Sequence, residues 1–231
     1  MDIHKPKPWH GLREFLKEYA IIVLGVLTAL GLEQSAEWLH WRHVVHHDRV
    51  ALRDESADIY GALLGRVDQQ DCIDRRLADI GAILKRHSSG EPLRISGPVG
   101  RPSSFIPSLG AFDMAIADQS LSHMSQEEKS SYYAVRSSWT FFDSTESAEL
   151  DTWRTLRALD HADALTPNRW EEVSKAYDRA SDLNEVLKAN LRYGQGSWLE
   201  PFRSLPRPSK EDTSLRIMPW VKQLCAGTIA P

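Results

Sequence analysis

The two cysteines of the chain, Cys72 and Cys225, are the first residues whose chemistry has to be decided. In an exported domain they can form a disulfide that closes a loop of about 150 residues, worth about 4–5 kcal/mol in the chain-entropy description. In a cytoplasmic domain the ordinary expectation is two buried free thiols. We predict the disulfide on the condition that this part of the chain is exported, because the redox compartment decides between the two states.

Four histidines lie close together in the sequence: His40, His43, His46 and His47. On a helix, His43 and His47 face the same side and His40 lies one turn before them, a spacing at which imidazoles can chelate Zn²⁺ or a similar ion. The glutamate of a zinc-protease helix is missing between them. The plainer interpretation is a polar, partly cationic collar at the level of lipid headgroups. We therefore predict no metal site and keep a pH- or metal-responsive sensor as an alternative function.

Polar residues interrupt two otherwise apolar helical stripes. Arg66 and Gln70 break the first stripe, and Glu146 and Glu149 break the second. If the two helices pack antiparallel, Arg66 meets Glu146 or Glu149 in a buried polar layer, and such layers more often fix register than perform chemistry. No adjacent nucleophile or metal ligand accompanies the carboxylates. A phosphate-binding loop, a dinucleotide fingerprint and a nucleophile elbow are also missing. We predict no catalytic residue, no cofactor and no enzyme, with an unrecognised enzyme as an alternative.

The position of the cysteines, histidines and charged residues relative to a membrane depends on an uncharged run from Tyr19 to Leu32, YAIIVLGVLTALGL. As a helix it covers about 21 Å, against about 30 Å of bilayer hydrocarbon. Apolar residues extend it on the N-terminal side, and Lys17 can reach back to the interface. Trp9 and Trp38 are separated by about 43 Å of helix, close to the thickness of a bilayer with its headgroups. We predict a membrane span over residues 19–39.

Three other interpretations of the run fit less well. A cleaved signal peptide needs small residues at its processing site, and the stretch after the run matches poorly, although cleavage after Gly31 or Ala36 stays open. A buried core helix needs a comparable apolar partner, which the sequence does not offer. An in-plane helix needs one strongly charged face, whereas this run is apolar all round.

The basic residues around the span predict its orientation. Residues 1–18 carry Lys5, Lys7, Arg13 and Lys17, whereas residues 33–52 carry Arg42 and Arg49. This bias places the N-terminal segment, 1–18, in the cytoplasm and residues 40–231 in the periplasm of a bacterium. Gly25 and Ala29 form a small-xxx-small pair that continues through Leu32 and Ala36, so a homodimer through the span is also expected.

Helical periodicity organises the remaining residues into an all-α, bundle-like domain. A heptad stripe from Val45 to Ile80 predicts one long helix, or two stacked helices, ending near His87. Proline- and glycine-rich stretches at 88–107 and 200–212 predict loops, and a short helix is expected around Phe112. Further helices are signalled by a capping box at Ser125–Glu128, by Thr166-Pro167, and by C-terminal apolar residues. The apolar residues expected in the C-terminal helix are Ile217, Met218, Trp220, Val221 and Leu224.

Composition limits the classes of partner. The 231 residues include 28 Lys and Arg against 32 Asp and Glu, which gives a formal charge of −4. This charge does not indicate a nucleic-acid partner. With 42% apolar and 26% charged residues, the chain is neither disordered nor a multi-span transporter. The expected partners are membrane lipid, a second copy of the chain and an unknown envelope protein, in a non-catalytic interaction or scaffold role.

The stretch EFLKEYAIIVLGVLTAL from Glu14 to Leu30, followed by Trp38 and Trp41, resembles an uncharacterised bacterial family. The stretches CIDRRL at Cys72–Leu77 and GPVGRP at Gly97–Pro102 are similar to the proteobacterial branch of such proteins. The resemblance implies a short N-terminal span in the inner membrane followed by a helical extramembrane domain. It implies no activity, so it bears on topology and leaves the mechanism open.

Overall fold

Helices make up the regular structure of the residues that the computed structural model describes, which are 11–102, 106–107, 109–192, 196–203 and 224–229. The α-helices are α1 Leu12–Asp68, α2 Gln70–Ser88, α3 Gly110–Ala117, α4 Gln126–Leu156 and α5 Pro167–Asn190. Three 3₁₀ helices accompany them: η1 Ser120–His123, η2 Arg157–Ala164 and η3 Glu200–Phe202. The prediction of an all-α domain with a long N-terminal helix packed against other helices is confirmed.

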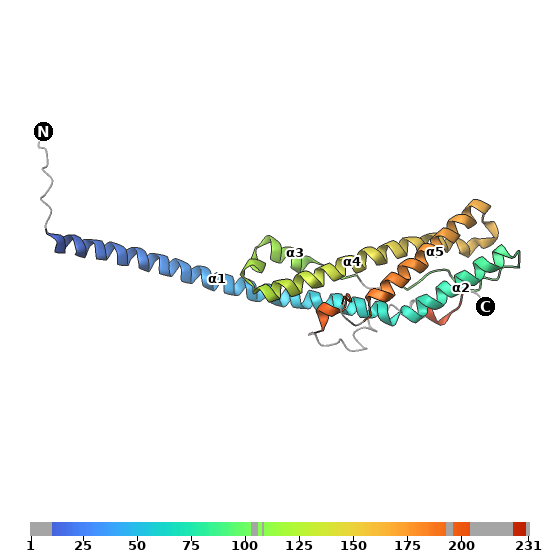
Figure 1. The fold of residues 1–231 in the computed structure, drawn as a ribbon, viewed down its shortest axis with the longest axis horizontal. Helices are drawn as coiled ribbons and strands as arrows, with labels where there is room; N and C mark the ends of the chain where they lie inside the picture. Colours follow the sequence, from blue (N-terminus) through green and yellow to red (C-terminus); the bar gives the residue numbers. More distant parts are fainter. Residues whose placement is uncertain (1–10, 103–105, 108, 193–195, 204–223, 230–231) are drawn as a thin grey trace, which may run out of the picture.

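The first half of α1 extends alone from one end of the bundle (Figure 1). We call residues 12–40 the shaft, and all of its side chains are exposed except Val23, which is half-buried. Packing against the rest of the chain begins near Trp41, which is half-buried, and one face of α1 is buried from Val45 onward, at Val45, Leu52 and Ile59. A helix of 57 residues is about 86 Å long, so α1 reaches well beyond the domain that it supports.

The structure decides between one long helix and two stacked helices in favour of two. The α-helical pattern breaks at Gln69, which caps both α1 and α2 in a right-handed conformation. The second helix ends at Ser88, close to the predicted end at His87. The heptad stripe continues across the break, because Ile73 and Ile80 are as fully buried as Ile59.

α4 runs in the same direction as α1, which corrects the antiparallel arrangement that we expected for the two polar stripes. Arg49 pairs with Glu128 near the start of α4, and Arg66 pairs with Glu149 near its end. The long segment between α2 and α3 returns the chain to the shaft end of the bundle, so α4 can start there again (Figure 1). α5 is antiparallel to both α2 and α4, since Trp170 stacks on His87 at the far end of the bundle.

Helix starts follow the signals that the sequence contains. Ser125 accepts a hydrogen bond from the Glu128 amide, and the Glu128 side chain accepts one from the Ser125 amide, which is the predicted capping box. The Thr166 side chain caps α5 by accepting a hydrogen bond from the Arg169 amide, and Pro167 lies in the first turn. These caps satisfy amides that a helix cannot pair internally, and so they set where α4 and α5 begin.

Apolar faces of both α4 and α5 contribute to the core. Trp139, Phe142, Trp153 and Leu156 of α4 are buried, and Val173 and Leu187 of α5 are fully buried. The short helix expected around Phe112 is α3, whose Phe112 and Ala115 face the core whereas Ile116 is 48% exposed.

The predicted loop at 88–107 starts one residue too early, because Ser88 is the last residue of α2, and from residue 89 onward it is irregular wherever it is described. In the predicted loop at 200–212, residues 200–202 form η3, and residues 204–212 lie outside the described residues. Of the apolar residues expected in a C-terminal helix, only Leu224 is described, and it is helical.

Candidate functional site

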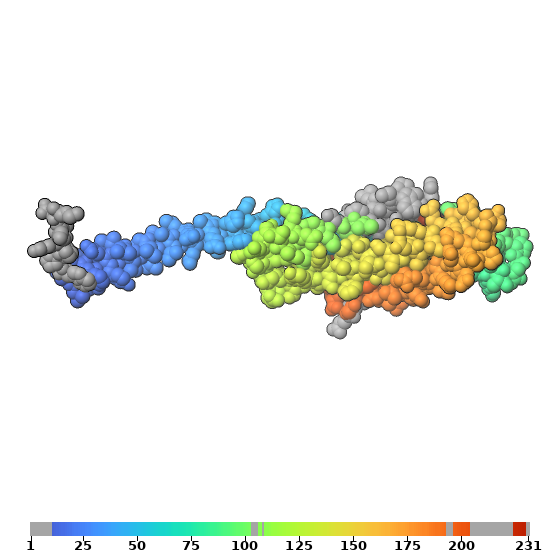
Figure 2. Space-filling view, turned by 90° about the horizontal axis from the view of Figure 1, so that it is seen from above, coloured from blue at the N-terminus to red at the C-terminus, as the bar shows by residue number. Residues whose placement is uncertain are grey.

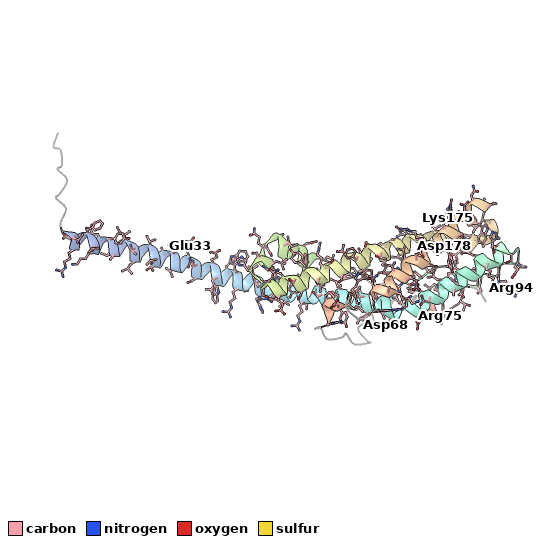
Figure 3. The ribbon with its side chains drawn as sticks, viewed as in Figure 1. Glu33, Asp68, Arg75, Arg94, Lys175 and Asp178 are labelled. Atoms are coloured by element: carbon pink, nitrogen blue, oxygen red, sulfur yellow. A yellow bond between two sulfur atoms is a disulfide. The ribbon has the colours of Figure 1, made fainter. Side chains whose placement is uncertain are left out.

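The shaft is the part of the molecule with the clearest chemical character. Of the described helices, α1 alone is long and apolar enough to cross a membrane, and no part of its apolar window is buried in the structure. Its exposed large apolar side chains follow one another along the shaft: Leu12, Phe15, Leu16, Tyr19, Ile21, Ile22, Leu24, Val26, Leu27, Leu30 and Leu32. Figure 2 shows this segment clear of the bundle, and Figure 3 labels Glu33 on it, next to the end of the uncharged run. The shaft is therefore a candidate for a single membrane span.

The predicted histidine collar lies where the shaft meets the bundle. The ring of Trp41 stacks on His123 of η1 at 3.8 Å between centroids and also contacts His40. His43 and His46 are exposed, and the Nδ1 atom of His47 lies 3.2 Å from the Asp48 carboxylate. Among the described residues, no group of three histidine, cysteine or acidic side chains could hold a metal ion. Within one chain, Trp41 and His123 form a stacked pair where α1 meets η1, while His43 and His46 remain exposed.

The polar interruptions of the two stripes meet inside the bundle, although the two helices run parallel and not antiparallel as we expected. Arg66 lies 3.6 Å from the Glu149 carboxylate, and both side chains are completely buried. Arg101, from the return segment, joins them at 3.0 Å from Glu146 and 3.3 Å from Glu149. We call these four residues the charged cluster. It holds two positive and two negative side chains, so each buried charge has an opposite charge as a neighbour.

A hydrogen-bonded network extends the charged cluster to α2 and α5. Arg66 donates to the side chains of Gln70 at 2.7 Å and Asn184 at 2.8 Å. Both amide side chains donate in turn to Asp74, each at 2.8 Å. Asp74 also pairs with Lys188 at 3.2 Å, where the network reaches solvent. The network thus links α1, α2, α4 and α5 around one buried arginine.

Burial and charge shift the titration of these groups in defined directions. Burial raises the pKa of the Glu149 carboxyl, while the Arg101 and Arg66 guanidinium groups act to lower it. Burial lowers the pKa of Arg66. Partial burial acts to raise the pKa of Asp74, but the hydrogen bonds that it accepts outweigh burial and lower this pKa overall. Both carboxylates of the cluster form ion pairs with guanidinium groups, an arrangement that holds helices in register.

The structure contains the disulfide between Cys72 and Cys225, with 5.4 Å between their Cα atoms. Beside it, Arg76 of α2 donates to the Leu224 carbonyl at 2.9 Å and to the carbonyls of Pro98 and Gly100. The carboxylate of Asp79 accepts the Ile229 amide at 2.8 Å. The side chain of Ile229 is fully buried in the core of α2, α4 and α5. One face of α2 therefore ties down both the return segment and the C-terminal segment.

Sequence reasoning missed Arg76 and Arg101. Arg101 stands in the proline-rich GPVGRP stretch, which has no helical period and predicts only a loop. Arg76 stands on a helix with charged neighbours, where an arginine is normally assigned to solvent. For Arg76, the available signal was its position next to Leu77 on the buried stripe and four residues after Cys72.

Comparisons of the chain with known protein families, with curated proteins and with solved structures give no match.

Proposed function

We propose that this chain is a single-span protein of the bacterial inner membrane, with residues 1–18 in the cytoplasm and residues 40–231 in the periplasm. Its role in this proposal is non-catalytic: it is an interaction or scaffold protein that presents a rigid helical domain. The observation that carries the proposal is an exposed apolar helix continuous with a helical domain that is closed by a disulfide. Disulfides persist in the periplasm and are rare in the cytosol.

Two further arguments support the orientation and compartment. The basic residues before the span outnumber those after it, which favours a cytoplasmic N-terminus. The resemblance of the segment around the span to proteobacterial single-span proteins favours the inner membrane. The carboxylates of Glu146 and Glu149 support a structural role, because both are buried and ion-paired with arginines inside the bundle.

Membrane lipid, a second copy of the chain and another envelope protein are the partners that this role implies. Gly25 and Ala29 lie one turn apart on the exposed shaft, and small residues at this spacing let two membrane helices approach closely. We include a homodimer through the span in the proposal on this ground.

The topology is tested with reporter fusions at the C-terminus in a Gram-negative host. An alkaline phosphatase fusion should be active and a green fluorescent protein fusion dark, since the first folds only after export and the second only in the cytoplasm. Leu27→Arg is the matched control, because an arginine at mid-span costs about 2.5–3.5 kcal/mol of insertion free energy and should reduce phosphatase activity. A bright, well-expressed fluorescent fusion with inactive phosphatase would overturn the orientation.

A further inference from the structure

One exposed face of α1 keeps heptad spacing from the span into the aqueous part of the helix. Its residues follow one another at alternating steps of four and three: Gly25, Ala29, Leu32, Ala36, Leu39, His43, His46 and Val50. We call this face the α1 seam. All of its side chains are exposed, including Leu32 at 69%, Leu39 at 59% and Val50 at 51%. Alternating steps of four and three are the pattern with which two helices pack along a shared seam.

We propose that the α1 seam is a parallel homodimer interface that continues beyond the membrane, and that His43 and His46 form a layer in it which weakens the dimer when protonated. The proposal rests on the proposed membrane anchoring, because a shared membrane and a common orientation hold two copies parallel.

The seam lies on the side of α1 that faces away from the bundle. Val45 and Leu52 face α3 and η1, and each follows a seam residue, His43 or Val50, by two positions. Two positions correspond to about 200° of turn on an α-helix, so the two faces are nearly opposite. Two copies can therefore join along α1 with their bundles on the outside. After Val50 the free face narrows, because Tyr60 and Leu64 are buried against the segment around Phe202.

The composition of the seam fits a second copy of the same chain. Within the span it has small residues at Gly25, Ala29 and Ala36, which let two helices come close. In a parallel pair, residues five apart flank the seam from opposite chains, so Arg49 of one copy faces Asp54 of the other. These are opposite charges, and the Arg49 side chain remains 43% exposed while it pairs with Glu128.

The histidine layer brings four imidazoles together in such a pair, two from each copy, at two successive seam positions about 4.5 Å apart along the helix. The titratable and charged groups nearest to the layer on α1 are His40, Arg42, His47 and Arg49. Those on the other side of α1, toward the bundle, are Asp48, His123 of η1 and Glu128 of α4. In the same register Arg42 of one copy faces His47 of the other, which adds a cation beside the layer. Histidine is the residue that gains charge between about pH 8 and pH 5, and like charges across an interface oppose association.

Cysteine cross-linking of the full chain in membranes tests the seam. Leu32→Cys and Leu39→Cys place thiols on the seam, and Gln34→Cys places one two residues away, on the opposite face. The native cysteines are paired with each other and do not compete. Mild oxidation should convert the two seam variants to dimers at least severalfold more than Gln34→Cys. Equal cross-linking at all three positions, or none, would overturn the seam, whereas a chain missing from the membrane fraction would instead contradict the anchoring.

Sedimentation equilibrium of the full chain in detergent, with a chelator present, tests the histidine layer. The association constant should fall about tenfold between about pH 8 and pH 5, equivalent to about 1.4 kcal/mol. The double variant His43→Leu/His46→Leu should still dimerise and lose this dependence, whereas His40→Leu, off the seam, should keep it. A dimer whose affinity is the same at both pH values, or whose pH dependence survives in the double variant, would overturn the histidine layer and leave the seam standing.

Discussion

Replacing Glu149 by glutamine is the sharpest perturbation of the domain, because it removes one charge from a buried, balanced set without changing the volume of the side chain. Glu146, which lies 3.0 Å from Arg101, would then be the one carboxylate left in the charged cluster. Removing one partner of a buried ion pair costs about 3–5 kcal/mol, since it leaves an uncompensated charge away from water. We expect the lower end of this range, about 3 kcal/mol, because Glu146 still compensates part of the charge.

The assay is urea unfolding of the full chain in detergent micelles, followed by tryptophan fluorescence. Trp153 is buried one turn from Glu149 and so reports on this region. A loss of about 3 kcal/mol corresponds to a fall in melting temperature of about 6–12 °C for a domain of this size. Glu172→Gln is the matched control, because its exposed pair with Arg169 should contribute less than about 1 kcal/mol. If Glu149→Gln costs no more than this control, the cluster does not hold the helices in register.

The remaining predictions concern the packing and covalent closure of the domain. A Cβ atom on Gly81 would lie 2.6 Å from the Tyr177 hydroxyl, whereas one on Gly65 would meet nothing within 4 Å. In urea unfolding, Gly65→Ala should therefore stabilise the protein by about 0.5–1 kcal/mol, and Gly81→Ala should not stabilise it. An equal gain at both positions would contradict the close approach of α2 and α5. The hydrogen bond that Arg49 donates to Glu128 lowers the pKa of the Glu128 carboxyl below 4.5. The Arg49–Glu128 pair therefore stabilises the folded state above that pH, and this contribution is lost as the pH falls through the lowered pKa. Glu128→Gln should therefore lose less stability than the wild type between about pH 5 and pH 3, and parallel pH profiles would count against this. Cys72→Ser should lower the free energy of unfolding by about 3–5 kcal/mol and make this stability insensitive to dithiothreitol. If dithiothreitol still destabilises the variant, the effect of the reductant does not come from the Cys72–Cys225 disulfide.

Local spacing was enough to predict which faces of the helices are buried. Val45, Leu52 and Ile59 lie seven residues apart, and this interval fixes a common side of a helix whatever that side packs against. The partners Arg66 and Glu149 could be matched for the same reason, since each interrupts an apolar stripe and a buried charge needs an opposite charge.

The path of the chain between helices could not be predicted in this way. The segment between α2 and α3 has no period, so nothing in it says whether the next helix runs with or against the previous one. Its length permits a return along the bundle, and the return is what brings Arg101 to Glu146 and makes α1 and α4 parallel. The role of His43 and His46 in the proposed dimer could not be predicted from the sequence either. It depends on which face of α1 the bundle leaves exposed, and only the packing of α3 and η1 on the opposite face decides that.

The continuity of α1 has a mechanical consequence. Asp68, at the end of α1, lies about 44 Å of helix beyond Leu39, without an intervening break. A span that tilts by about 20° in its bilayer would sweep the end of this lever sideways by about 15 Å. A rotation of the span about its own axis would turn the whole bundle by the same angle. A change in membrane thickness or in neighbouring helices would thus be converted, through one rigid rod, into a large displacement of the domain.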